Sequence, residues 1–148
     1  MSSKNQKTIL AGIIGTAIMT VVMMLAPMMG MPKMSPPQML SGMLGAPVFV
    51  GWLMHFMIGI VFAFVYTYLC ILKAKISSVY MKGVVFGIAI FIIAQIVMAI
   101  MGAVKPMPAP EGSKMLAIMG SLIGHIIYGI AVAKTVGDSY SAKACSIS

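Results

Sequence analysis

The two histidines of the chain, His55 and His125, carry its clearest chemical signal, because each stands in a long apolar run. Each has a small residue four positions before it and another four positions after it. The flanking residues are Gly51 and Gly59 around His55, and Ser121 and Gly129 around His125. Residues four apart stack on adjacent turns of a helix. The repeated spacing therefore indicates that the two histidines act as a pair.

A paired imidazole site of this kind can hold a haem b. In an apolar surrounding each imidazole is expected to be neutral, with one N–H donor and one lone pair for a metal. The two histidines would be axial ligands of the iron for electron transfer, and the small residues would leave room for the flat macrocycle. The cofactor-binding residues are then His55, His125, Gly51, Gly59, Ser121, Gly129 and Gln95.

Two other arrangements satisfy the same imidazoles. One is copper bound by His55, His125 and a methionine, either Met23, which lies in the common layer, or Met54 or Met57, since thioether and imidazole suit this metal and the chain holds 18 methionines. In the other, no cofactor is bound, and each histidine forms a hydrogen bond within the bundle. The partners for such bonds are Gln95, Thr20, Tyr128 and backbone carbonyls.

Composition places these histidines in a membrane. Of the 148 residues, 61% are hydrophobic and 8% are charged, whereas a soluble domain carries about 25% charged residues. The net charge of +8 comes from ten lysines, and the chain has no arginine, the usual bidentate ligand of phosphate. The lysines lie near the ends of apolar segments, so the charge reflects membrane topology and not nucleic-acid binding.

Four apolar segments are long enough to cross a bilayer, which takes about 20 residues. They cover about residues 8–29, 47–72, 79–101 and 114–136, and Pro27 is expected to kink or fray the first of them. Ser35 and Pro36 predict a short helix over about residues 36–44 at the membrane interface. We predict an all-α polytopic membrane protein with a single four-helix transmembrane domain over residues 1–148.

The lysines also predict the orientation, because seven fall on one side of the membrane and three on the other. The seven are Lys4, Lys7, Lys73, Lys75, Lys82, Lys134 and Lys143, and the three are Lys33, Lys105 and Lys114. The positive-inside rule places the first side, and with it both termini, in the cytoplasm.

The halves of the chain form a weak internal repeat, with five identities between residues 15–30 and 87–102. A second match pairs His55, Gly59, Ile60 and Ala63 with His125, Gly129, Ile130 and Ala133. The repeat predicts two parallel-repeat helical hairpins that form a four-helix bundle. By residue count, one side chain of each span falls in a common layer near mid-membrane or in its outer half. These side chains are Met23, His55, Gln95 and His125.

Several function classes are excluded by what the spans lack. No Asp or Glu lies inside them, so the carboxylate relay of a proton-coupled transporter is missing and no Ser-His-Asp triad can form. The chain has no Gly-rich phosphate loop, and its spans hold too few polar residues to line a channel. We expect no enzymatic activity.

Several segments resemble a family of small prokaryotic integral membrane proteins with four predicted helices and no assigned function. These segments are Gly15–Thr20, Pro27–Met34, Gly51–Gly59 and Ser121–His125. The resemblance covers nearly the whole chain and implies a multi-pass protein of the prokaryotic inner membrane. It implies no reaction.

Two functions of different classes remain open. The first is a cofactor-binding protein, with haem b or copper at the paired histidines. The second is an accessory subunit that carries no cofactor and packs against other membrane protein subunits or copies of itself. The lipid bilayer is a partner in both. The histidines favour the first function, and the short polar tails favour the second.

Overall fold

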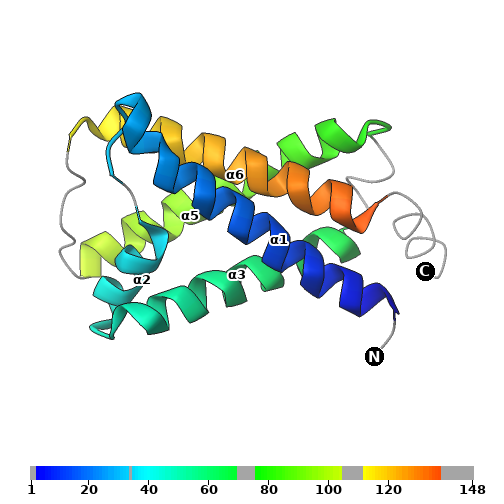
Figure 1. Cartoon of the computed structure of the whole chain (residues 1–148), viewed down its shortest axis with the longest axis horizontal. Helices are drawn as coiled ribbons and strands as arrows, with labels where there is room; N and C mark the ends of the chain where they lie inside the picture. Colours follow the sequence, from blue (N-terminus) through cyan, green and yellow to red (C-terminus); the bar gives the residue numbers. More distant parts are fainter. Residues whose placement is uncertain (1–2, 34, 70–75, 105–111, 138–148) are drawn as a thin grey trace.

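The computed structural model describes residues 3–33, 35–69, 76–104 and 112–137, and the regular secondary structure in these residues is all helical. The long helices are α1 (Ser3–Leu25), α3 (Val48–Tyr68), α5 (Val79–Val104) and α6 (Lys114–Val136), which run along the length of the molecule (Figure 1). A short helix, α2 (Pro36–Leu44), precedes α3. The prediction of an all-α protein is confirmed.

The four long helices are long and apolar enough to cross a membrane. Large apolar side chains are exposed along all of them, for example Val21, Leu53, Ile96 and Ile118. An apolar surface of this extent is unusual for a soluble monomer, whereas in a bilayer it is the surface that meets lipid. The chain is therefore a multi-pass membrane protein.

The first predicted span changes from an α-helix to a 3₁₀ turn near its end. Helix α1 ends at Leu25, and a 3₁₀ turn, η1 (Ala26–Met29), follows and contains Pro27. Gly30 closes this turn with a φ of 80°, a left-handed conformation that favours glycine. The second predicted span reached residue 72, and residues 70–72 lie outside the described residues.

The short helix forms where it was predicted and rests on the start of α3. Ser35 precedes it in an extended conformation, Pro36 is its first residue, and Gly45 ends it with a φ of 65°. A Cβ at Gly51 would collide with the backbone of Pro37. Gly51 therefore allows α2 to lie directly against α3.

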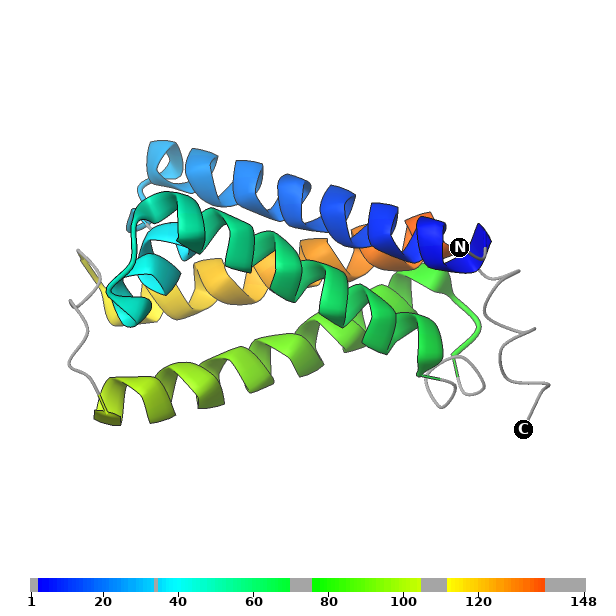
Figure 2. The ribbon, with the colours of Figure 1, turned by 90° about the horizontal axis from the view of Figure 1, so that it is seen from below.

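The long helices are packed together unevenly. Helix α1 packs against both α3 and α6, and α5 packs against α6. Figure 2 shows α5 beside its neighbours at the end where α1 begins and diverging from α3 toward the opposite end. The buried residues of α5 agree, because they begin at Lys82 and none follows Ile90 in this helix.

The α1–α3 pair and the α5–α6 pair each cross closely at a glycine and an isoleucine. A Cβ at Gly12 would lie 2.6 Å from the Cα of Ile60, and a Cβ at Gly83 would lie 2.5 Å from the Cα of Ile130. Small residues allow such close approach of backbones in membrane helices. Ile60 and Ile130 are matched residues of the sequence repeat, whereas Gly83 lies one position before the residue that matches Gly12, so the two helix pairs approach at registers that differ by one residue.

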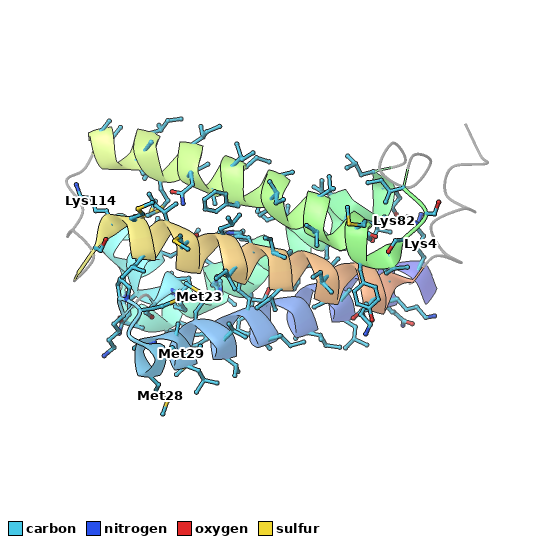
Figure 3. All side chains as sticks on the ribbon, turned by 90° about the horizontal axis from the view of Figure 1, so that it is seen from above. Lys4, Met23, Met28, Met29, Lys82 and Lys114 are labelled. Carbon is cyan, nitrogen blue, oxygen red and sulfur yellow. The ribbon has the colours of Figure 1, made fainter. Side chains whose placement is uncertain are left out.

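Charged side chains distinguish the two ends of the molecule. Lys4 lies over the ring of Tyr68 at 4.2 Å, and Lys134 lies over the ring of Tyr80 at 5.2 Å. Figure 3 shows Lys4 and Lys82 at this end, which we call the lysine end. Lys114, Met28 and Met29 are labelled toward the opposite end, which we call the methionine end. Lys73, Lys75, Lys105 and Lys143 lie outside the described residues, and the cytoplasmic position of the lysine end stays a prediction.

Candidate functional site

His55 is held by a threonine of the neighbouring helix. It is 8% exposed, and its Nε2 lies 3.1 Å from the Oγ1 of Thr20 on α1. The hydroxyl of Thr20 already donates its single proton to the carbonyl of Thr16, at 2.7 Å. Thr20 therefore accepts a hydrogen bond from Nε2–H, and the lone pair of His55 is on Nδ1. This Nδ1 has no hydrogen-bond partner among the described residues.

His125 is held by its own helix in the complementary tautomer. Its Nδ1 lies 2.7 Å from the carbonyl oxygen of Ser121 and 3.4 Å from the Ser121 hydroxyl. A carbonyl oxygen only accepts, so Nδ1 carries the proton and Nε2 carries the lone pair. The half-buried ring meets the edge of Phe91, with 6.0 Å between ring centroids. Within the described ranges, Nε2 of His125 has no hydrogen-bond partner.

His55 and His125 lie on helices that are joined by a hydrogen bond. The hydroxyl of Tyr128 donates to the carbonyl of Gly59 and joins α6 to α3. His55 lies four residues before Gly59, and His125 lies three residues before Tyr128, so both lie about one turn from this bond. Within the described residues, each ring thus keeps one nitrogen without a hydrogen-bond partner.

Met23 is a buried methionine of α1 with its sulfur against α6. It is 4% exposed, and Figure 3 shows it inside the molecule. Its Sδ lies 3.1 Å from the position that a Cβ at Gly124 would take, directly before His125 in the chain. Thr20, which holds His55, lies about one turn away on the same helix. Met23 is thus close to one chain neighbour of His125, Gly124, and to the threonine that holds His55.

The small residues around the histidines serve helix packing in the structure. A Cβ at any of the three glycines would collide with a neighbouring segment. These contacts join Gly51 to Pro37, Gly59 to the side chain of Thr16, and Gly129 to the backbone of Gly83. The clearance that a haem needs is therefore occupied by protein atoms. A macrocycle does not fit beside these glycines while the helices are this close.

Thr16 is a component of the site that the sequence analysis did not include. Its side chain is buried, and its Oγ1 has no hydrogen-bond partner among the described residues. The oxygen lies against Gly59, a position where C–H···O contacts are common between helices. Gly12, Thr16 and Thr20 are spaced four residues apart on α1. This spacing places Thr16 on the same helix face as Thr20 and could have indicated it from the sequence.

Gln95 is not joined to the histidines. It is half-buried on α5, beyond Ile90, the last buried residue of that helix. Among the described residues its side chain makes no hydrogen bond. Its predicted role as a ligand-like group stays a prediction.

The metal-ligating side chains in the described part of the chain are few. No group of three or more His, Cys, Asp or Glu side chains that could hold a metal ion occurs there. A three-ligand site built on the two histidines in that part therefore needs another ligand type. Met23 supplies one, a thioether, which selects soft ions such as Cu(I).

Comparison with known proteins gives a family. A family model described as a family of unknown function, DUF6789, matches residues 2–144. The chain belongs to this family. No curated protein and no solved structure matches the chain. Membership in DUF6789 supplies no reaction, so the chemistry of the chain is argued from its residues.

Replacing Thr20 by valine in this DUF6789 chain is expected to lower the free energy of unfolding by about 1 kcal/mol, because the Nε2–H of His55 loses its acceptor. Unfolding by SDS in mixed micelles measures this change. Thr135→Val is the matched control, because the half-buried Thr135 hydroxyl only donates within its helix, to Ala131 at 2.8 Å. Equal losses in the two variants would show that the bond to His55 adds nothing.

Proposed function

We propose that this small integral membrane protein binds one soft metal ion, Cu(I), inside the membrane, with His55, His125 and Met23 as ligands. One observation carries the proposal. Each histidine has one ring nitrogen held by a protein hydrogen bond, and its other nitrogen has no hydrogen-bond partner in the part of the chain that the structure describes. Histidines that bind metals almost always have this arrangement, because the held N–H fixes the tautomer and the ring orientation.

The ligand types favour Cu(I) over other metals. Two imidazoles and a thioether are neutral, soft or intermediate donors, which suit copper and not magnesium or calcium. With neutral ligands the complex carries the single charge of Cu(I), which is easier to bury than a divalent charge. A single ion also needs no clearance beside the glycines. The contact between Gly129 and Gly83 can then stay as it is.

The matched positions of the two histidines support the same proposal. His55 and His125 lie four residues before Gly59 and Gly129, the glycines at the two helix crossings. A pseudo-two-fold axis between the hairpins would bring equivalent side chains to a shared central site. The partners of the histidines differ, because Thr20 holds one ring and Ser121 the other.

The proposal is tested by titrating the purified protein with Cu(I) in competition with a chromophoric chelator. We expect one Cu(I) per chain. Met23→Leu is expected to lower the affinity at least about tenfold, because it removes a ligand while nearly conserving volume. Met24→Leu is the matched control, since Met24 is 66% exposed and Met23 only 4%. Equal affinities of these two variants would contradict the ligand set, and a Soret band in the purified protein would favour haem b instead.

A second candidate function, an accessory subunit of a larger membrane complex, is favoured by α5. No residue of this helix after Ile90 is buried, and the amide of Gln95 makes no hydrogen bond to the described residues. In lipid such an amide gains from a partner helix. Purification in mild detergent should then yield a larger assembly that Gln95→Leu dissociates. A wild-type protein with the mass of one chain would contradict this function.

A further inference from the structure

A second sulfur atom continues the candidate site toward the methionine end. Gly120 and Gly124 are buried, lie four residues apart on α6, and share one face of this helix. The Sδ of Met23 lies 3.1 Å from the Cβ position at Gly124, and the Sδ of Met31 lies 3.6 Å from the Cβ position at Gly120. Such positions are about 6 Å apart. The two sulfurs therefore follow α6 on successive turns and lead toward His125.

Met31 also lines an open pocket of about 530 Å³ at the methionine end. The pocket wall includes Pro27, Pro32, Lys33, Ser113 and Leu116. Met28 and Met29 in the adjoining turn η1 are 84% and 81% exposed, and Figure 3 shows Met28 extending away from the helices. Thioethers are thus present on the surface, at the pocket and in the interior.

We propose that the pocket at Met31 is the entry site for Cu(I), from which the ion passes to Met23 and the two histidines. This inference rests on the proposed function. Each step exchanges one neutral ligand for another, so that a bond from copper to one sulfur breaks as a bond to the next ligand forms. The ion stays Cu(I), and no proton or electron is transferred.

A packing role for Met31 makes a different prediction. Methionine fills irregular spaces in helix interfaces, and leucine of similar volume would fill this one nearly as well. A side chain that only packs can then be exchanged for leucine without changing the rate at which metal enters. If the sulfur of Met31 binds the entering ion, its replacement by leucine must slow metal entry.

The charge of the pocket gives a second criterion. Lys33 lines the pocket, and its ammonium group repels an approaching cation. Lys33→Gln is therefore expected to speed metal entry at low ionic strength, and the gain should fade as salt screens the charge. No change in the rate at low salt would place the entry path away from this pocket.

The experiment follows metal entry into the full chain in detergent by stopped flow, with Ag(I) as a redox-stable probe and the fluorescence of Trp52 as the signal. Trp52 is the single tryptophan and lies three residues before His55. Met31→Leu is expected to slow entry about tenfold and to leave the equilibrium stoichiometry unchanged. Met115→Leu is the control, because Met115 is the second residue of α6, lies at the same end and is 74% exposed.

The outcomes separate the entry site from the proposed function. Slow entry in Met31→Leu with full final binding supports the entry site. Entry at the wild-type rate, with one ion still bound by the wild-type chain, would overturn the entry site and leave the histidine site intact. A wild-type chain that binds no metal at all would overturn both.

Discussion

Replacement of Gly129 by alanine is expected to separate α5 from α6 and to lower the free energy of unfolding by about 3 kcal/mol. A Cβ at this position would lie 2.8 Å from the backbone nitrogen of Gly87 and 2.9 Å from its Cα, and it would also collide with the backbone of Gly83. Backbone atoms cannot turn aside as the end of a side chain can. Loss of helicity during SDS titration of the purified variant measures the change.

The matched control for this prediction is Gly102→Ala. Gly102 lies on α5, where a Cβ would meet nothing within 4 Å. Alanine forms helix more readily than glycine by about 1 kcal/mol, so the variant should be as stable as the wild type or slightly more stable. If Gly129→Ala behaves like Gly102→Ala, the close crossing of α5 and α6 is not part of the native structure.

Substitution of either histidine by glutamine is expected to lower the Cu(I) affinity more than about 100-fold. Loss of residues that merely orient metal ligands lowers affinity by about 10–100-fold, and His55 and His125 are proposed as the ligands themselves. Competition titration measures the affinity of each variant.

The histidine variants must also be shown to fold as the wild-type protein does. Glutamine keeps a polar side chain at each position, so each variant should elute and unfold as the wild type does, within about 1–2 kcal/mol. A folded variant that binds Cu(I) as tightly as the wild type would exclude that histidine from the site. If either variant fails to fold, Met23→Leu tests the same site without touching a histidine.

The helices were predictable because their signals are local. Uncharged segments of membrane length predicted the four spans. The short helix is bounded by Ser35 and Gly45 and begins with Pro36, residues that are typical of these positions. The end of α1 at Leu25 also follows from a neighbour in sequence, Pro27. None of these features depends on how the helices are rotated against one another.

The partners of the site residues depend on that rotation, which sequence periodicity does not fix in a segment that is apolar on all sides. Depth along the helix indicated Met23 as a partner of the histidines, and the structure places it inside the molecule, against Gly124. Depth also grouped Gln95 with them, and this grouping stays a prediction, since no residue of α5 after Ile90 is buried. The role of Gly51 required knowledge of α2, which rests on it.

The measurement that tests the central claim most directly is X-ray absorption at the copper K-edge of the Cu(I)-loaded wild-type protein. We predict two nitrogen ligands with the multiple scattering of imidazole rings, together with one sulfur, from His55, His125 and Met23. A shell made only of sulfur would place the ion among methionines and away from the histidines. Either that shell or a protein that retains no copper would contradict an intramembrane site at the paired histidines.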